Sequence, residues 1–217
     1  MKNVRLFYTK KDRMKFVSHL DMNRFMIRTV RKAKLPIWYT EGFNPHPYIT
    51  FALPLSLGFQ SSYEIMDIRL TDDDYDINNI CEKLNAVCPP YINFFDACEP
   101  ILKTGAVAFA HYNITFDDNK KILSLFLEFL NKESITVSKK TKKGDIKQFD
   151  ILPKIKDLDL KEKNGNTYLS LTLPAGSTDN VNPELLITAF YEQTNTDYFC
   201  YSVERDLILD ESLKPFK

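Results

Sequence analysis

The sequence predicts an α+β protein made of two tandem ferredoxin-like units, each with the element order β-α-β-β-α-β. Three observations support this prediction. The first half of the chain alternates between strand-like and helix-like patterns in that order. The order recurs, less regularly, in the second half. The length of 217 residues suffices for two domains of ordinary size, so we place the boundary at Thr104-Gly105, which gives units 1–103 and 104–217.

The N-terminal unit begins with an extended segment followed by a well-marked helix. Residues 4–18 alternate unevenly, as a strand or a hairpin does. Helical spacing then starts at Ser18, a predicted N-cap with Asp21 three residues later, and Pro36 marks the stop. The other expected elements are extended pieces within 36–58, a strand at 63–70, a helix at 74–90 and a strand at 91–100.

The C-terminal unit repeats this order around a predicted hairpin with a basic tip. Its expected elements are a strand at 106–116, a helix at 120–132, the hairpin at 134–151, a strand at 167–176, a helix at 182–193 and a last strand at 197–209. Sequence identity between the halves is not evident, so the repeat depends on element order alone.

Composition is that of an ordinary globular protein and points to no metal or cofactor. Hydrophobic residues make up 44% of the chain and charged residues 27%. The longest strongly apolar stretch, 122–130, is too short to span a bilayer, and the start shows no cleavable signal region. We therefore expect a cytoplasmic protein with no membrane partner. The four cysteines form no CxxC pair, so we expect buried thiols rather than a metal site: Cys81, Cys88, Cys98 and Cys200.

Charge is balanced over the whole chain but strongly separated along it. Residues 1–50 hold eleven Lys and Arg against three acidic residues, a net charge of +8. Residues 51–138 hold six against thirteen, a net charge of −7. A basic end attracts polyanions. The alternative is that the basic and acidic segments pair with each other in the fold.

Two basic clusters are candidates for contact with phosphate. Arg24, Arg28 and Arg31 are spaced four and three apart, which places them on one face of the predicted helix. Their forked donors suit phosphate oxygens, although a solvated helix face explains the same spacing. The second cluster is the tip of the predicted hairpin, where RNA phosphates would neutralise lysines that an exposed loop also tolerates: Lys139, Lys140, Lys142 and Lys143.

The stretch "EGFNPHP" predicts a stiff loop that presents polar side chains. Pro45 and Pro47 each hold the preceding residue, Asn44 and His46, in extended geometry, just after the freely bending Gly42. Aromatic residues flank the loop, and a base could stack on an exposed ring: Trp38, Tyr39, Phe43, Tyr48 and Phe51. We expect Trp38 and Phe51 in the core, and Tyr39, Asn44 and His46 on a binding surface. A merely structural corner is the alternative.

The catalytic residues, if there are any, stay unknown from the sequence, with His46 and His19 as candidates. The usual pKa of histidine suits a general base. Neither residue has a nucleophile or a metal cluster in its own segment, and the third histidine, His111, falls in a predicted strand. Glu64 and Asp67 are three apart in a strand, so they face opposite sides of the sheet and form no carboxylate pair.

The segment from Phe16 to Leu70 resembles the signature of a bacterial radical-SAM-associated domain of unknown function, which stands alone or is fused to cobalamin-type radical-SAM proteins. The resemblance is carried by "SHLD", "GFNPHP" and "PLSLG", and later by "KTKKGDIKQFDILPKI" and "GSTDNVNPELLITAF". It implies a radical-SAM protein as partner. The chain has no CxxxCxxC run for the usual cluster, which makes it an accessory.

Positions that match the family pattern are Ser18, His19, Asp21, Arg24, Gly42, Asn44, Pro45, His46, Pro47 and Gly58, with Lys142, Lys143, Asp150 and Pro153 in the later block. The resemblance assigns no catalytic role to them, and Gly42, Pro45, Pro47 and Gly58 are interpreted as structural. Three hypotheses follow. The protein is an RNA-binding accessory that takes tRNA or rRNA, a module that docks on a radical-SAM subunit without RNA, or an RNA-processing enzyme that uses His46 or His19.

Overall fold

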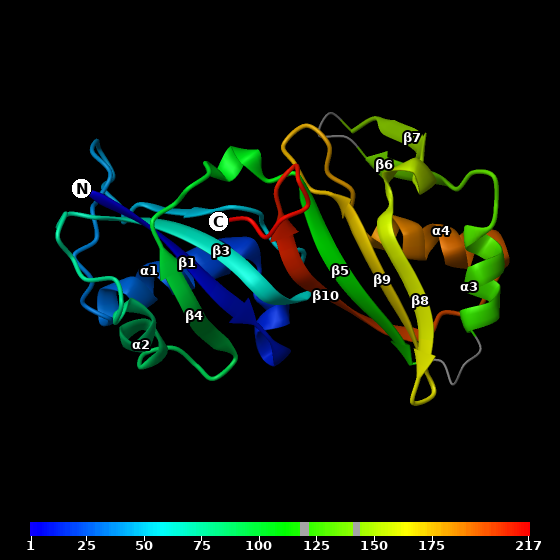
Figure 1. Cartoon of the computed structure of the whole chain (residues 1–217), viewed down its shortest axis with the longest axis horizontal. Helices are drawn as coiled ribbons and strands as arrows, with labels where there is room; N and C mark the ends of the chain where they lie inside the picture. The colour runs from blue at the N-terminus through cyan, green and yellow to red at the C-terminus, as the bar shows by residue number, and fades with distance from the viewer. Residues whose placement is uncertain (118–121, 141–143) are drawn as a thin grey trace. The chain divides into compact units, whose positions relative to one another are not determined.

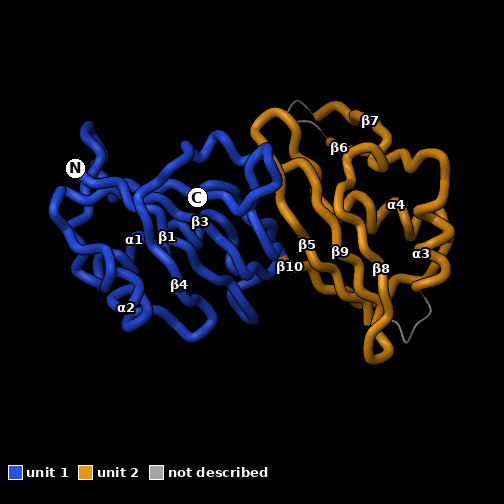
Figure 2. Tube along the Cα trace, in the orientation of Figure 1, with its two compact units in different colours: residues 1–107, 205–217 blue, residues 108–204 orange. Residues whose placement is uncertain are grey.

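The structure, a computed structural model, describes residues 1–117, 122–140 and 144–217. This part of the chain is a mixed α/β structure with a large sheet and four α-helices (Figure 1). Contacts divide the chain into two compact units (Figure 2). Unit 1 comprises residues 1–107 and 205–217, and unit 2 comprises residues 108–204. The division falls inside the last strand, β10 (Cys200–Leu209).

Unit 1 has the predicted order of strand, helix, strand, strand, helix, strand. Its elements are β1 (Lys2–Lys10), α1 (His19–Lys32), β2 (Ile49–Phe51), β3 (Gln60–Leu70), α2 (Ile80–Asn85) and β4 (Ile92–Cys98). The strands are antiparallel in the order β4-β1-β3, with β2 on β3. The segment predicted as a strand or hairpin is one strand followed by a 3-10 turn, Asp12–Phe16.

The central strand β1 is buried on both faces. The five consecutive residues 4–8, "VRLFY", are accordingly all buried. On one face Val4, Leu6 and Tyr8 join the apolar side of α1 in the core of the unit. On the other face Arg5 forms a two-pronged ion pair with its cross-strand neighbour Asp67, with N–O distances of 2.8 and 2.7 Å. The ring of Phe216 lies 4.7 Å from the Arg5 guanidinium carbon. The last residues of the chain therefore cover this face.

A second buried ion pair ties the end of β10 to unit 1. Arg205 donates to Glu64 Oε1 from Nη2 at 2.5 Å and from Nε at 3.1 Å. Its other donors reach the carbonyls of Leu53 and Pro54 at 2.7 and 3.3 Å. Glu64 and Asp67 thus pair with different arginines, as their opposite faces in β3 predict. Burial, assisted by the Glu64 carboxylate, raises the pKa of Tyr8 well above its usual value.

Unit 2 contains one strand that the sequence pattern did not predict. Its elements are β5 (Phe109–Asp117), α3 (Ile122–Leu130), β6 (Thr136–Lys140), β7 (Ile146–Asp150), β8 (Lys156–Lys163), β9 (Asn166–Pro174), α4 (Glu184–Thr194) and the first part of β10. The strands of its sheet follow the order β10-β5-β9-β8. The hairpin β6-β7 forms a separate two-stranded sheet beside α4 (Figure 1).

The missed strand β8 reads "KDLDLKEK", and most of its side chains are exposed, Asp159 among them. Charged residues are typical of edge strands, which lack the apolar alternation used to recognise a strand. A local signal was nevertheless present. Asn164 and Gly165 both have positive φ values, 54° and 86°, and an Asn-Gly pair is the usual two-residue turn of a β-hairpin. The predicted hairpin at 134–151 is present, but β8 occupies its expected place in the sheet.

Three of the four cysteines are half-buried, and one is exposed. Cys81, Cys88 and Cys98 are half-buried, and burial raises the pKa of each thiol. Cys200 is exposed, which corrects the expectation that all four thiols are buried.

Within the described residues, no helix has the length and apolar character needed to cross a membrane.

Candidate functional site

Helix α1 begins where the sequence predicts, because Ser18 caps it. The Ser18 hydroxyl accepts the Asp21 backbone N–H at 3.2 Å and donates to the Asp21 carboxylate at 2.8 Å. Met22, Met26 and Val30 form the buried side of the helix. The opposite side is therefore fixed toward solvent, and it carries the predicted arginines.

Replacing Ser18 by Ala removes this cap, and we expect a loss of about 1 kcal/mol in the free energy of unfolding. The measurement is urea unfolding followed by the fluorescence of Trp38, the only tryptophan of the chain. Ser134→Ala, at an exposed position outside α1, is the control and should unfold as the wild type does. Equal midpoints for the two variants would contradict the capping role.

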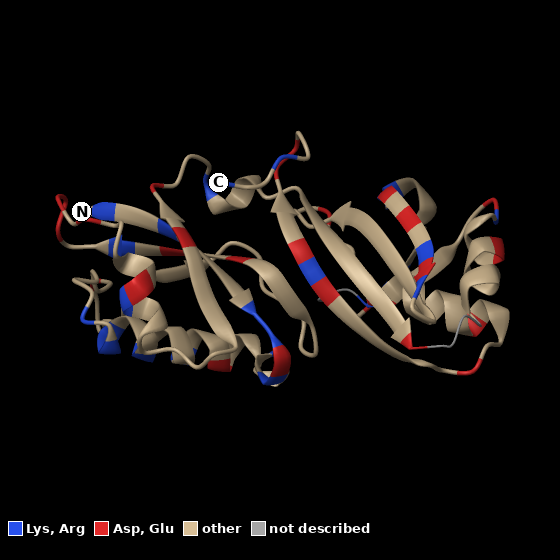
Figure 3. Ribbon diagram, turned by 60° about the horizontal axis from the view of Figure 1, so that its bottom comes forward, with Lys and Arg blue, Asp and Glu red and all other residues tan. Residues whose placement is uncertain are grey.

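The predicted arginines Arg24, Arg28 and Arg31 are all exposed. Figure 3 shows where basic residues (blue) and acidic residues (red) fall along the ribbon. Arg24 contacts Asp21 at 3.2 Å, an exposed pair of little energetic weight. Arg31 Nε donates to the hydroxyl of Tyr39 at 3.0 Å, and its guanidinium carbon lies 5.5 Å from the centre of that ring. Arg28 contacts no carboxylate in the described part of the chain. Within the described residues, Arg24 is therefore the one arginine of the stripe that pairs with a carboxylate of the protein.

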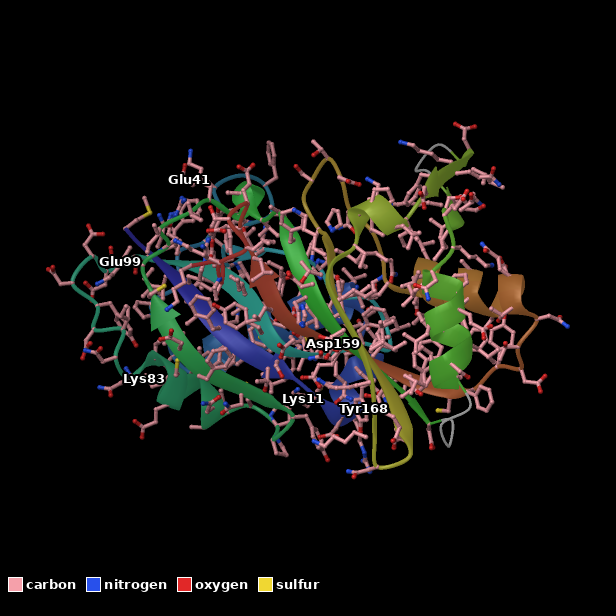
Figure 4. The ribbon with its side chains drawn as sticks, turned by 45° about the vertical axis from the view of Figure 1, so that its right-hand side comes forward. Lys11, Glu41, Lys83, Glu99, Asp159 and Tyr168 are labelled. Carbon is pink, nitrogen blue, oxygen red and sulfur yellow. The ribbon has the colours of Figure 1, made fainter. Side chains whose placement is uncertain are left out.

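The "GFNPHP" loop closes on itself and projects from unit 1. Thr40 N–H donates to the His46 carbonyl at 2.9 Å, and His46 N–H donates to the Thr40 hydroxyl at 3.2 Å. Residues 41–46 are exposed, Glu41 among them (Figure 4). Gly42 has a φ of 126° and Gly58 a φ of 87°, values that favour glycine and fit the structural role expected for both. Thr40, which no sequence pattern indicated, anchors the loop.

The ring of His46 is oriented by this loop. Its Nδ1 lies 3.1 Å from the Thr40 hydroxyl and 3.1 Å from the carbonyl oxygen of Asn44. Because a carbonyl oxygen only accepts, the second contact places a proton on Nδ1, which leaves Nε2 of the neutral ring as an acceptor. Hydrogen-bond recognition suits this arrangement.

The aromatic residues around the loop divide into exposed and half-buried groups. Tyr39 is exposed, as expected, and Phe43 is fully exposed. Trp38 and Phe51, expected in the core, are only half-buried. Trp38 is held by Arg69, which lies over its ring at 5.0 Å, and Phe51 meets the ring of His19 edge-on at 5.1 Å. These cationic and imidazole partners sit at the surface, which is why neither ring is fully enclosed.

A groove of about 500 Å³ lies in unit 1 next to Tyr48, just after the loop. Its lining comprises Asn3, Tyr48, Asp67, Arg69 and residues 100–104. Arg69 stands over Tyr48 at 4.5 Å and donates to Asn3 at 3.0 Å. No sequence pattern indicated Arg69, because a single arginine in a strand carries no pattern. Arg69 contacts Tyr48 and Asn3 because strand β3 packs against the segment after the loop and against β1.

The remaining predicted residues have separate locations. The exposed His19 lies at the start of α1, and the contacts of His46 are to Thr40 and Asn44. His111 in β5 lies between the hydroxyls of Thr172 and Ser170, at 2.8 and 2.9 Å. Lys142 and Lys143 lie outside the described residues. In the part of the chain that the structure describes, no group of three or more His, Cys, Asp or Glu side chains is arranged to hold a metal ion.

The fold and this surface define a class: an α/β protein with an arginine-bearing helix beside a stiff, aromatic-flanked polar loop. Comparison with family models then places the chain. It belongs to the family described as an uncharacterized protein conserved in bacteria (DUF2344), whose model matches residues 3–183. A search of curated proteins found no match. The match includes α1, the loop and the hairpin β6-β7.

Proposed function

We propose that the protein is an RNA-binding accessory that holds tRNA or rRNA for a radical-SAM partner. The observation that carries the RNA-binding part is the exposed arginine stripe of α1 joined to the polar loop through the hydrogen bond between Arg31 and Tyr39. Phosphate contacts fix a nucleic acid in place, and neighbouring polar and aromatic groups read unpaired bases. Both kinds of group are present on this one surface.

Each part of the surface has a separate task in this proposal. Arg24 and Arg28 contact phosphate oxygens, because forked guanidinium donors match them. The exposed rings of Tyr39 and Phe43 offer stacking surfaces for a base. The exposed His46 offers Nε2 as an acceptor for a hydrogen bond from a base amino group. The stiff backbone lowers the entropy cost of forming these contacts.

The radical-SAM partner, the cytoplasmic location and the division into two ferredoxin-like units are parts of the same proposal. The partner is supported by the sequence resemblance, and the fold by the β-α-β-β-α-β order of unit 1. The protein would act as a substrate carrier, since the chain has no cysteine run for the usual cluster.

Changing Arg24, Arg28 and Arg31 together to Glu tests the proposal. We expect affinity for total tRNA and for rRNA fragments to fall at least about tenfold, and the slope of log affinity against log salt to shrink by about 2–3 as phosphate contacts are lost. Filter binding over a salt series measures both. The matched control reverses three cations outside α1: Lys83, Lys132 and Lys163. Unchanged affinity in the arginine variant, or an equal loss in the control, would refute RNA binding by this helix.

A second function, docking on an acidic radical-SAM subunit without RNA, is favoured by one observation. Phe43 is fully exposed in the loop that follows Tyr39, the contact of Arg31, and interfaces commonly use an aromatic anchor within a polar surround. Pull-down of the partner with and without nuclease separates the two functions. Capture that survives nuclease and is lost in Phe43→Ala supports docking, whereas capture lost on nuclease treatment supports RNA.

The enzyme hypothesis has less support from the geometry. The described contacts of His46 are with a hydroxyl and a carbonyl, and its ring is fixed by them. A general base takes a proton from a group within hydrogen-bond reach. For His46 to act in this way, that group would have to be a hydroxyl of the bound RNA. His46→Ala that leaves cleavage of a bound RNA unchanged would exclude this role.

A further inference from the structure

A second basic site lies in unit 2, away from the residues used in the proposed function. It is a pocket of about 340 Å³ between the hairpin β6-β7 and the loop that follows β9. Its lining residues are Lys139, Lys140, Lys147, Phe149, Lys154, Thr178, Asp179 and Asn180. Four lysines against one aspartate give the lining a formal net charge of +3.

The register of the hairpin brings two of these lysines together. Lys139 in β6 lies directly opposite Lys147 in β7. Like charges at opposed positions of an antiparallel pair are destabilising. The neighbouring pair on the same face, two residues along, is Val137 and Phe149, of which Val137 is buried and Phe149 half-buried. The hairpin therefore turns this face toward the body of unit 2 and places two ammonium groups at one site.

The protein itself neutralises only part of this charge. Lys154 pairs with Asp179, with an N–O distance of 2.5 Å. Lys139 donates to the backbone carbonyl of Asn180, a neutral acceptor that leaves its charge uncancelled. Among the described residues, neither Lys140 nor Lys147 has a carboxylate partner. An anion from outside would remove the remaining repulsion.

The entry of Lys154 into the pocket is fixed by a built turn. The carboxylate of Asp150 accepts the backbone N–H groups of Ile135 and Leu152, at 2.9 and 3.1 Å. A 3-10 turn follows, Leu152–Lys154, with Pro153 in its first positions. Asp150 and Pro153, which match the resembled family pattern, thereby hold Lys154 against the hairpin.

We propose that this pocket binds a phosphate-bearing anion. Lysines act on phosphate as point charges, and a volume of about 340 Å³ falls in the range of small-ligand sites. Phe149, with Lys154 Nζ at 5.6 Å from its ring centre, adds an apolar wall that suits a phosphate attached to an organic group. The inference stands on unit 2 alone and does not depend on the proposed function of α1.

Calorimetric titration with sodium pyrophosphate and with 5′-AMP tests the proposal on the full chain. Wild-type protein should bind, and Lys139→Gln with Lys147→Gln should weaken the affinity at least tenfold. The double variant removes a repulsive pair, so its thermal midpoint should be equal to or above that of the wild type, which shows that it folds. The control, Lys161→Gln with Lys163→Gln in the exposed strand β8, should bind normally.

The arginine variant of α1 separates this inference from the proposed function. It should bind pyrophosphate as the wild type does, whatever its affinity for RNA. The affinities of a 5′-phosphorylated oligonucleotide and of its 5′-hydroxyl counterpart show whether the natural phosphate belongs to RNA. If the wild type binds the phosphorylated form more tightly and the double lysine variant does not, the ligand is an RNA end. Binding of pyrophosphate or AMP with no such difference assigns a free phosphate compound. The proposal would be overturned if no probe binds, or if the double variant binds the probes as tightly as the wild type does. It would also be overturned if sulfate competes for the site as well as pyrophosphate does.

Discussion

Replacing Glu64 by Ala will destabilise the protein by about 3–5 kcal/mol, because it removes the carboxylate that pairs with the buried guanidinium of Arg205. Arg205 is only 1% exposed, and Glu64 accepts two of its donors. The carbonyls of Leu53 and Pro54 would remain as partners, but neutral oxygens do not cancel a buried charge. Urea unfolding followed by Trp38 fluorescence measures the loss, since Trp38 lies in the same unit.

Two further variants identify the cause of that loss. Glu64→Leu with Arg205→Met replaces the pair by apolar groups of similar volume and should recover most of the stability, since such replacements are often neutral or stabilising. Asp74→Ala removes an exposed carboxylate of the same unit and should change little. A loss below about 1 kcal/mol in Glu64→Ala would mean that water reaches Arg205 and that the pair is not buried as described.

Replacing Phe126 by Ala will cost unit 2 about 3–5 kcal/mol, the usual range for removing a buried ring. Phe126 in α3 is fully buried and lies 4.4 Å, centre to centre, from Phe190 in α4. Phe116 of β5 and Phe129 of α3 complete the cluster, with ring centres 5.8 and 5.7 Å from that of Phe126. Hydrogen exchange of peptides from residues 108–204 measures the effect in this unit.

The control for this prediction lies one residue along the same helix. Leu127 is 46% exposed, so Leu127→Ala removes little buried surface and should cost less than about 1 kcal/mol. Because both substitutions lead to alanine in one helix, helix propensity does not account for the difference in the expected costs. Equal effects would show that α3 turns a different face to the sheet.

Local features of unit 1 could be predicted well from the sequence. The Ser18 cap, the apolar side of α1 and its stop before Pro36 depend on interactions within a few residues, so their patterns are visible in the chain. The exposed loop with its oriented His46 is similarly local, since two prolines and one glycine set its backbone. The exposure of Arg31, Tyr39 and Asn44 was accordingly predicted, while the loop contacts of Thr40 were missed.

The order of the elements in unit 1, the exposed side of α1 and the shape of the proline loop can thus be predicted from residues close together in the chain. Packing of distant segments sets which strands share a sheet, gives β8 the place expected of the hairpin, and brings Arg205 to Glu64. It also assembled the lysine pocket from Lys139, Lys147 and Lys154. The physical reason is range. Side-chain periodicity and turn chemistry act between neighbours, whereas pairing between distant segments depends on which faces are buried when the whole chain packs.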